Sequence, residues 1–215
     1  MDTLQMFFLT AFTTIFVIVD PIGNVMVFLS LTEDKDSGER RRIAGRTAIF
    51  GSLVLLIFAI FGNYIFSFFQ ITVDSLRVIG GILILLIAMD MMHGKMSREG
   101  HTPEEVEESG ERDDISFFPM AVPMLAGPGA ITTAIILMNT AATVPFKLTV
   151  LISIILVFLI CWFLFCLSEG IHRVLGVTGN MVITRMMGLI LGAIAVQFIT
   201  TGLWNIYMML HGGIG

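Results

Sequence analysis

The sequence has little charge. Only 13% of its 215 residues are charged, against about 25% in an ordinary soluble domain, while 56% are hydrophobic and the mean hydropathy is +0.92. Most of the charge lies at residues 33–46, 93–114 and 169–185, and long stretches between these clusters carry one charge or none. This distribution excludes a soluble globular domain, a disordered chain and a nucleic-acid-binding protein. It predicts a polytopic membrane protein, whose first partner is the lipid bilayer.

Other absences narrow the class further. The two cysteines, Cys161 and Cys166, lie in one apolar run at a spacing that points them to different helix faces, so a disulfide between them is not expected. Residues 1–5 contain no basic residue, so we expect the first apolar run to be a span rather than a signal peptide. The chain lacks the HExxH, GxSxG and GxxxxGK[ST] motifs. We therefore expect no enzymatic activity, no direct use of ATP, and no metal or cofactor.

The apolar runs have the length of transmembrane helices. A bilayer crossing needs about 20 apolar residues, and runs without the strict alternation of a β-barrel strand are typical of helices. The sequence predicts an all-α membrane protein, a single transmembrane domain over 1–215 with six transmembrane helices. The expected spans are 4–31, 43–69, 73–92, 115–139, 146–168 and 182–210.

The basic residues predict the orientation. Ten of the twelve lie after the first, third and fifth spans, and only Arg77 and Lys147 lie on the other side. Loops rich in Lys and Arg stay in the cytoplasm. We therefore expect both termini outside, and a cytoplasmic acidic linker at 93–114.

The two halves of the chain resemble each other weakly. Arg77 matches Arg185, and Gly80 matches Gly188, at an offset of 108, while two proline motifs match at 107. A repeat of three spans must be inverted relative to its partner, because an odd number of crossings reverses the chain. The sequence thus predicts a 3+3 inverted repeat, with repeats at 1–92 and 115–215, as in transporters that bind substrate near the midplane between repeats.

Spans one and four are expected to be interrupted. Pro21 is followed by Gly23, and Pro128 lies between Gly127 and Gly129. Proline removes a backbone hydrogen bond from a helix, and broken backbone in lipid must be buried in protein or line a wet cavity. Kinks that serve only helix packing are the alternative. Two matched breaks favour a binding site, and the helix N-termini after them favour anions.

Asp20 lies deep in the first span. Roughly 17 Å of helix separates it from Glu33, and an ionised carboxylate at such depth is costly and usually functional. It is a candidate proton carrier, cation ligand or partner for a substrate amine; a protonated or arginine-paired structural Asp is the alternative. A re-entrant turn remains open in place of a simple broken helix.

A few further polar residues complete the candidate site. Asn24 and Thr132 flank the breaks, and Arg77, Arg185 and Gln197 are possible supporting residues, although Gln197 is also typical of an interhelical hydrogen bond. Thr184, Gly188 and Gly192 form a stripe of small residues, typical of close helix packing against this chain or a second subunit of a homo-oligomer. The expected substrate-binding residues are Asp20, Pro21, Gly23, Asn24, Gly127, Pro128, Gly129 and Thr132.

At Asp20-Pro-Ile-Gly-Asn24, Phe118-Pro-Met, Ala126-Gly-Pro-Gly-Ala130 and Arg77-Val-Ile-Gly-Gly the sequence resembles the MarC family of bacterial inner-membrane proteins. The likeness covers essentially the whole chain. It implies a bacterial inner-membrane location and transport of small neutral amino acids.

These observations lead to one functional hypothesis and one alternative. We expect a secondary transporter of small neutral amino acids or similar small metabolites, coupled to H+ or Na+ through Asp20. The alternative is a channel or a non-transporting regulatory membrane protein.

Overall fold

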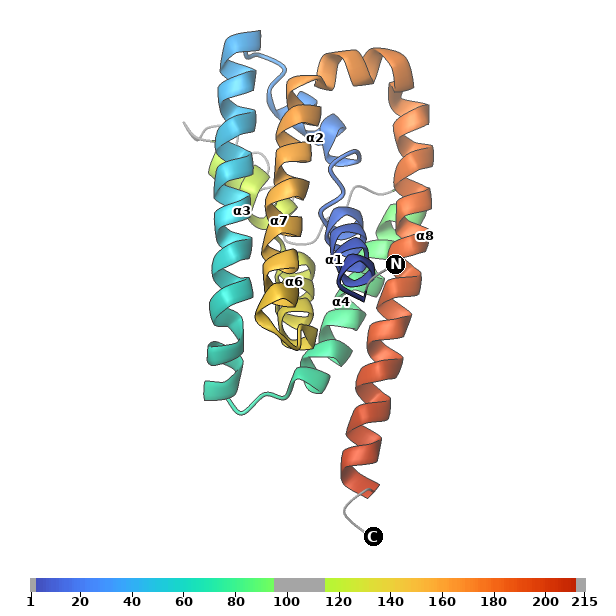
Figure 1. Cartoon of the computed structure of the whole chain (residues 1–215). Coiled ribbons are helices and arrows are strands. Elements are labelled where there is room, and N and C mark those ends of the chain that lie inside the picture. Colours follow the sequence, from blue (N-terminus) through green and yellow to red (C-terminus); the bar gives the residue numbers. More distant parts are fainter. Residues whose placement is uncertain (1–2, 95–114, 212–215) are drawn as a thin grey trace.

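The computed structural model describes residues 3–94 and 115–211. All regular elements in these two ranges are helical, and they assemble into one bundle (Figure 1). Most of the expected acidic linker, 95–114, lies outside the described residues. The elements in chain order are α1 (Thr3–Val19), α2 (Asn24–Leu31), α3 (Ser37–Phe68), α4 (Val73–Met92), η1 (Ser116–Leu125), α6 (Pro128–Thr140), α7 (Val144–Cys166) and α8 (Ser168–His211).

The membrane crossings agree with the hydropathy pattern. In the described residues four helices, α3, α4, α7 and α8, are each long and apolar enough to cross a bilayer alone. Two bent pairs, α1 with α2 and η1 with α6, meet the same test only together, which gives up to six crossings. The bends are 42° and 57°, so each chain segment turns without reversing its direction. The predicted interruptions of spans one and four are confirmed.

The charged ends of the long helices differ from expectation. The expected spans began at residues 43 and 182, but α3 begins at Ser37 and α8 at Ser168, so charged residues before those spans, such as Arg40–Arg42 and Arg173, are helical. The Asp36 carboxylate starts α3 by accepting from the backbone N–H groups of Gly38 and Glu39, both at 2.8 Å. A charged first turn that is capped in this way is stable in water, so the helix can extend beyond its apolar stretch. In Figure 1 the first turns of α8 cross the end of the bundle, and at Gly176 (φ 60°) the helix bends down into it.

The η1 segment is irregular rather than a loosened helix. Phe118 and Val122 have extended backbone, and each precedes a proline. Proline disfavours the helical conformation in the residue before it, so Pro119 and Pro123 interrupt the segment twice before the break at Gly127.

α4 and α8 pack against each other more extensively than any other pair of described elements, and they run antiparallel (Figure 1). Glycines allow this approach. A Cβ on Gly81 would lie 2.9 Å from the carbonyl oxygen of Ala195, and one on Gly188 would lie 3.0 Å from that of Ala88. The small-residue stripe of α8 therefore has its partner inside the chain.

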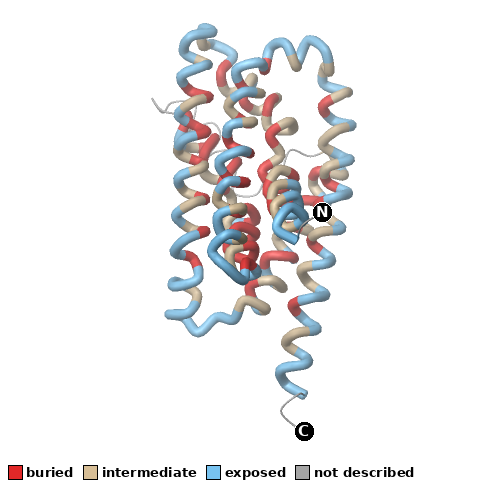
Figure 2. The backbone as a smooth tube through the Cα atoms, viewed as in Figure 1, coloured by how far each residue is buried: buried red, intermediate tan, exposed pale blue. Residues whose placement is uncertain are grey.

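The burial pattern is that of a bundle surrounded by lipid. Buried residues lie on the inward faces and exposed ones on the outer faces (Figure 2). The core includes Phe28 and Phe165, whose rings stack 4.6 Å apart. Large apolar side chains such as Leu189 (67% exposed) cover the outside. Trp204 and Tyr207 stack on the exposed face of α8, as expected for an interfacial aromatic belt.

One polar cluster ties three elements together at the end where α3 begins. The Arg40 guanidinium pairs with Glu169 at the start of α8, and its Nε donates to the carbonyl of Thr32, at the end of α2, at 2.8 Å. Three chain segments distant in sequence are thereby joined at the end of the bundle that the basic residues predict to be cytoplasmic.

Candidate functional site

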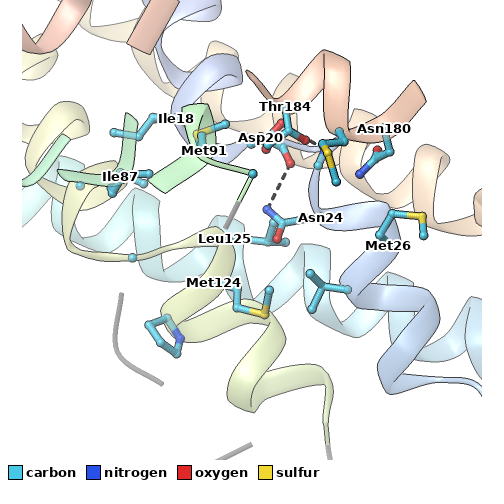
Figure 3. A pocket seen from close by; sticks show the side chains of 18 of the residues that line it. Ile18, Asp20, Asn24, Met26, Ile87, Met91, Met124, Leu125, Asn180 and Thr184 are labelled. Atoms are coloured by element: carbon cyan, nitrogen blue, oxygen red, sulfur yellow. Dashed lines mark hydrogen bonds between the residues drawn. The ribbon is translucent and has the colours of Figure 1, made fainter. Parts of the chain in front are cut away.

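Both helix breaks open onto one cavity of about 160 Å³. It lies between the α1–α2 break, the η1–α6 break, the C-terminal part of α4 and the part of α8 that follows Gly176. Figure 3 shows its polar side chains, with Asp20, Asn24, Thr184 and Asn180 labelled. Its lining is Ile18, Asp20, Gly23, Asn24, Met26, Val27, Ile87, Met91, Gly94, Pro123, Met124, Leu125, Gly127, Pro128, Gly129, Ala130, Val177, Asn180, Met181 and Thr184.

Asp20 is held by the break itself. Its φ is 46°, in the left-handed region that L residues rarely adopt and that Asp and Asn tolerate best. The Gly23 N–H donates to its carboxylate Oδ1 at 3.1 Å, so the carboxylate caps the helix that follows. Within the described chain no basic side chain forms an ion pair with Asp20. The arginine-paired alternative therefore does not hold for these residues.

Asn24 satisfies the backbone groups that the break exposes. Its Nδ2 donates to the carbonyl of Val19 at 2.9 Å. It also donates to the carbonyl of Asp20 at 3.1 Å (Figure 3). The Val19 carbonyl would otherwise lack a partner in a low-dielectric setting, at a cost of several kcal/mol, whereas the Asp20 carbonyl also accepts from the backbone N–H of Asn24 at 3.1 Å. Asn24 therefore stabilises the break and also lines the cavity.

The second break presents an open helix N-terminus. α6 starts with Pro128 at its first position, and no side chain caps it. Gly129 and Ala130 lie in its first turn, where N–H groups have no carbonyl of their own helix to bond. Both residues line the cavity. The α2 N-terminus was also expected to attract an anion, but its first N–H is already occupied by Asp20.

Several residues of the predicted site do not line the cavity. Pro21 is buried beside it, and the methyl group of Thr132 instead faces Gly80. Thr132 is thus outside the cavity lining in this structure, because helical spacing from a break does not fix which face of the helix turns inward. The supporting candidates Arg77, Arg185 and Gln197 also lie outside its lining.

Arg77 belongs to a separate cluster at the opposite end of α4. Its guanidinium donates to Asp74 Oδ1 at 2.7 Å and to Thr140 Oγ1 at 3.2 Å. Asn205 Nδ2 of α8 also donates to Asp74, at 2.9 Å. The cluster connects α4, α6 and α8 away from the cavity.

Two polar residues of the cavity, Asn180 and Thr184, were not predicted as site residues from the sequence. Asn180 is only 8% exposed, and its Oδ1 has no hydrogen-bond partner among the described residues. Asn180 lies next to a charged segment that was taken for a loop, which concealed it. A lone Asn at the start of a span was the only signal available.

The described residues contain no group of three His, Cys, Asp or Glu side chains that could hold a metal ion. The polar groups of the cavity are instead one carboxylate, two amides, a hydroxyl and the free N-terminus of α6. Such a set can hydrogen-bond a small polar molecule, while Met and Ile side chains contact its apolar part.

These features define a polytopic α-helical membrane protein in which two broken helix pairs meet at an internal cavity. The chain belongs to the MarC family of integral membrane proteins, whose model matches residues 5–207. The resemblance stated from the motifs is confirmed.

The relatives are similar over nearly their whole length. A UPF0056 membrane protein of Methanocaldococcus jannaschii is 40% identical over 96% of this chain and 90% of its own. YvbG of Bacillus subtilis is 38% identical (95% and 97%), and YhcE of Escherichia coli 35% (91% of each). All three are named UPF0056 membrane proteins, and the family is not confined to bacteria. No solved structure matches the chain.

Proposed function

We propose that the protein is a secondary transporter of small neutral amino acids or similar small metabolites, and not an enzyme. The observation that carries the proposal is the single cavity at which both broken helix pairs meet. Broken helices around a central site are the usual substrate-binding arrangement of secondary transporters. The proposed location is the inner membrane of a bacterium, with both termini outside.

The cavity supports a small substrate. A cavity of about 150 Å³ accepts a molecule the size of benzene, and alanine has as many non-hydrogen atoms as benzene. The cavity here, about 160 Å³, is of that size. A large or highly charged substrate would meet the apolar side chains of Ile18, Ile87 and Met124.

An inverted repeat is part of the proposal, and reciprocal contacts between α4 and α8 support it. Gly81 lies against Ala195 and Ile199, whereas Gly188 lies against Ala88 and Met92. Residues 81, 88 and 92 of α4 correspond to residues 188, 195 and 199 of α8 at an offset of 107. Each of the two contacts is therefore the other one with the roles of α4 and α8 exchanged.

Two further pairs have the same offset. Gly51 of α3 lies against Phe158 of α7, and these two positions also differ by 107. A contact between equivalent positions is expected on a two-fold axis. Pro21 and Pro128 differ by 107 as well. The packing thus favours 107 over the offset of 108 inferred from Arg77 and Arg185.

The cavity supports a state open toward the proposed cytoplasmic side. It is lined by Met91 and Gly94 near the end of α4, whereas the Asp74–Arg77 cluster lies at the other end of that helix. Exchange between this arrangement and its mirror in the second repeat would give alternating access. Asp20, the only carboxylate that residues 3–94 and 115–211 contribute to the lining, is the proposed coupling residue for H+ or Na+.

Counterflow in proteoliposomes tests the proposal. Vesicles preloaded with unlabelled alanine, serine or glycine should accumulate the labelled amino acid transiently, with saturation, and an imposed proton or sodium gradient should change the rate. A channel would give flux without counterflow. Absence of any flux for these substrates would contradict the transport function.

A further inference from the structure

The cavity contains a polar group that the packing of the chain does not use. Asn180 is more than nine-tenths buried on α8, it lines the cavity, and its Oδ1 has no partner among the described residues. A buried acceptor without a hydrogen bond is destabilising. Chains retain such groups when a ligand completes the hydrogen bond.

The α6 part of the cavity lining offers the complementary group. The N–H groups of Gly129 and Ala130 begin an uncapped helix of 13 residues, where the helix dipole favours negative charge. At 107 residues before Gly127 the first repeat has Asp20, whose carboxylate caps its own broken helix. Gly127, the residue in the equivalent place, has no side-chain carboxylate. The α6 N-terminus is therefore left open for the carboxylate of a ligand.

We infer that Asn180 and the α6 N-terminus bind the two charged groups of a zwitterionic α-amino acid. On binding, the Asn180 side chain turns its buried amide oxygen into the cavity and accepts a hydrogen bond from the substrate ammonium group, and the N–H groups of Gly129 and Ala130 donate to the substrate carboxylate. In the view of Figure 3, Asn180 and Thr184 lie on the same side of the cavity as Asp20, whose negative charge also favours an ammonium group. The inference rests on the proposed function, because it names the recognition of that same substrate class.

The apolar part of the lining determines which substrate side chains fit. Ile18 of α1 and Ile87 and Met91 of α4 line the cavity. These two helices contribute no polar side chain to the described lining. The substrate side chain contacts these residues. A short apolar or hydroxyl side chain fits, while a charged one would be desolvated without a partner.

The test separates recognition of the ammonium group from folding. The purified wild type, Asn180→Leu and the matched control Asn139→Leu are compared in detergent. Asn139 is an α6 residue outside the cavity lining, with its amide bonded to its own helix. Thermal-shift titrations give the affinities for alanine and for propionate, which has the carboxylate but no ammonium group.

Asn180→Leu should weaken alanine binding about 10- to 100-fold and leave propionate binding unchanged. Its melting temperature without ligand should equal or exceed that of the wild type, because the unsatisfied oxygen is gone. Asn139→Leu should bind both ligands as the wild type does.

Equal losses for alanine and propionate, or no loss for alanine, would overturn the inference. If Asn180→Leu does not fold, Asn180→Ala, which cannot clash, gives the same comparison. If the wild type transports alanine and Asn180→Leu binds alanine equally well, the role of Asn180 is refuted but the proposed function is not. Wild-type protein that neither binds nor transports any amino acid refutes the proposed function itself.

Discussion

At the scale of single residues, Asp20 combines two tasks. Its carboxylate accepts the Gly23 N–H, which starts α2, and it is also the negative charge of the cavity. Its left-handed backbone is strained for most residues. Such strain often coincides with a functional site, and here the conformation also directs the carboxylate back over the break.

Asp20→Asn should separate the two tasks. Asn tolerates positive φ and can still accept from Gly23 through its amide oxygen, so the melting temperature should change little. Because the charge is gone, transport should lose its response to an imposed proton or sodium gradient. Gradient-driven uptake in proteoliposomes measures this, with Asp90→Asn, outside the cavity, as the control; retained coupling in Asp20→Asn would contradict the proposed role.

Gly23→Ala tests the position of the carboxylate rather than its charge. A Cβ on Gly23 would lie 1.9 Å from Asp20 Oδ2, so the carboxylate must move away. The moving group is the end of a side chain, so the free energy of unfolding should fall by only about 1 kcal/mol, as for loss of a helix cap.

Transport in Gly23→Ala should nevertheless fall at least about tenfold, since a cost of 1.4 kcal/mol or more in the bound geometry is a factor of ten. Gly170→Ala, with no atom within 4 Å of its Cβ, is the matched control and should retain wild-type uptake. Equal uptake in the two variants would show that the carboxylate position is unimportant.

At the scale of helices, the contact between α4 and α8 depends on glycine. Gly188→Ala would place a Cβ 2.8 Å from Met91 Cβ and 3.0 Å from the Ala88 carbonyl oxygen. Neither atom can rotate away, so we expect a loss of about 1–3 kcal/mol of stability. This exceeds the gain of about 1 kcal/mol that Ala brings over Gly in a helix.

Gly192→Ala, one turn further along α8, is the matched control. Its Cβ would be 3.7 Å from Ala88 Cβ, an ordinary contact, so its melting temperature should equal or exceed that of the wild type. Melting curves of the detergent-solubilised variants measure the difference. If Gly188→Ala were as stable as Gly192→Ala, the close contact of α4 with α8 would be wrong.

At the scale of the whole molecule, orientation follows from charge. Lys35 and Arg40–Arg46 lie at the end of the bundle with the start of α8, and Thr143 lies at the opposite end, between α6 and α7. Single-cysteine variants Asp34→Cys and Thr143→Cys, with Cys161 and Cys166 replaced by Ser, test the orientation. In intact cells a membrane-impermeant maleimide should label Thr143→Cys at once and Asp34→Cys only after permeabilisation; the reverse pattern would invert the proposed topology.

The sequence by itself determined the membrane class, the approximate spans and the two breaks. These features depend on local properties, because hydropathy acts over one helix length and proline acts on its own turn. The charged helix ends, residues 37–42 of α3 and 169–181 of α8, were not predicted to be helical for the same reason, because they lie outside the apolar runs.

Only the tertiary structure decided which polar groups share the cavity. Asn180 lines the same cavity as Asp20 and Gly129 because α8 packs against α1, α2 and α4, and no local pattern predicts that they share it. Thr132, one turn beyond a break, faces Gly80 instead, because the close packing of α4 determines how α6 is rotated. Low charge identified a membrane protein, and packing then selected which of its few buried polar side chains face one another.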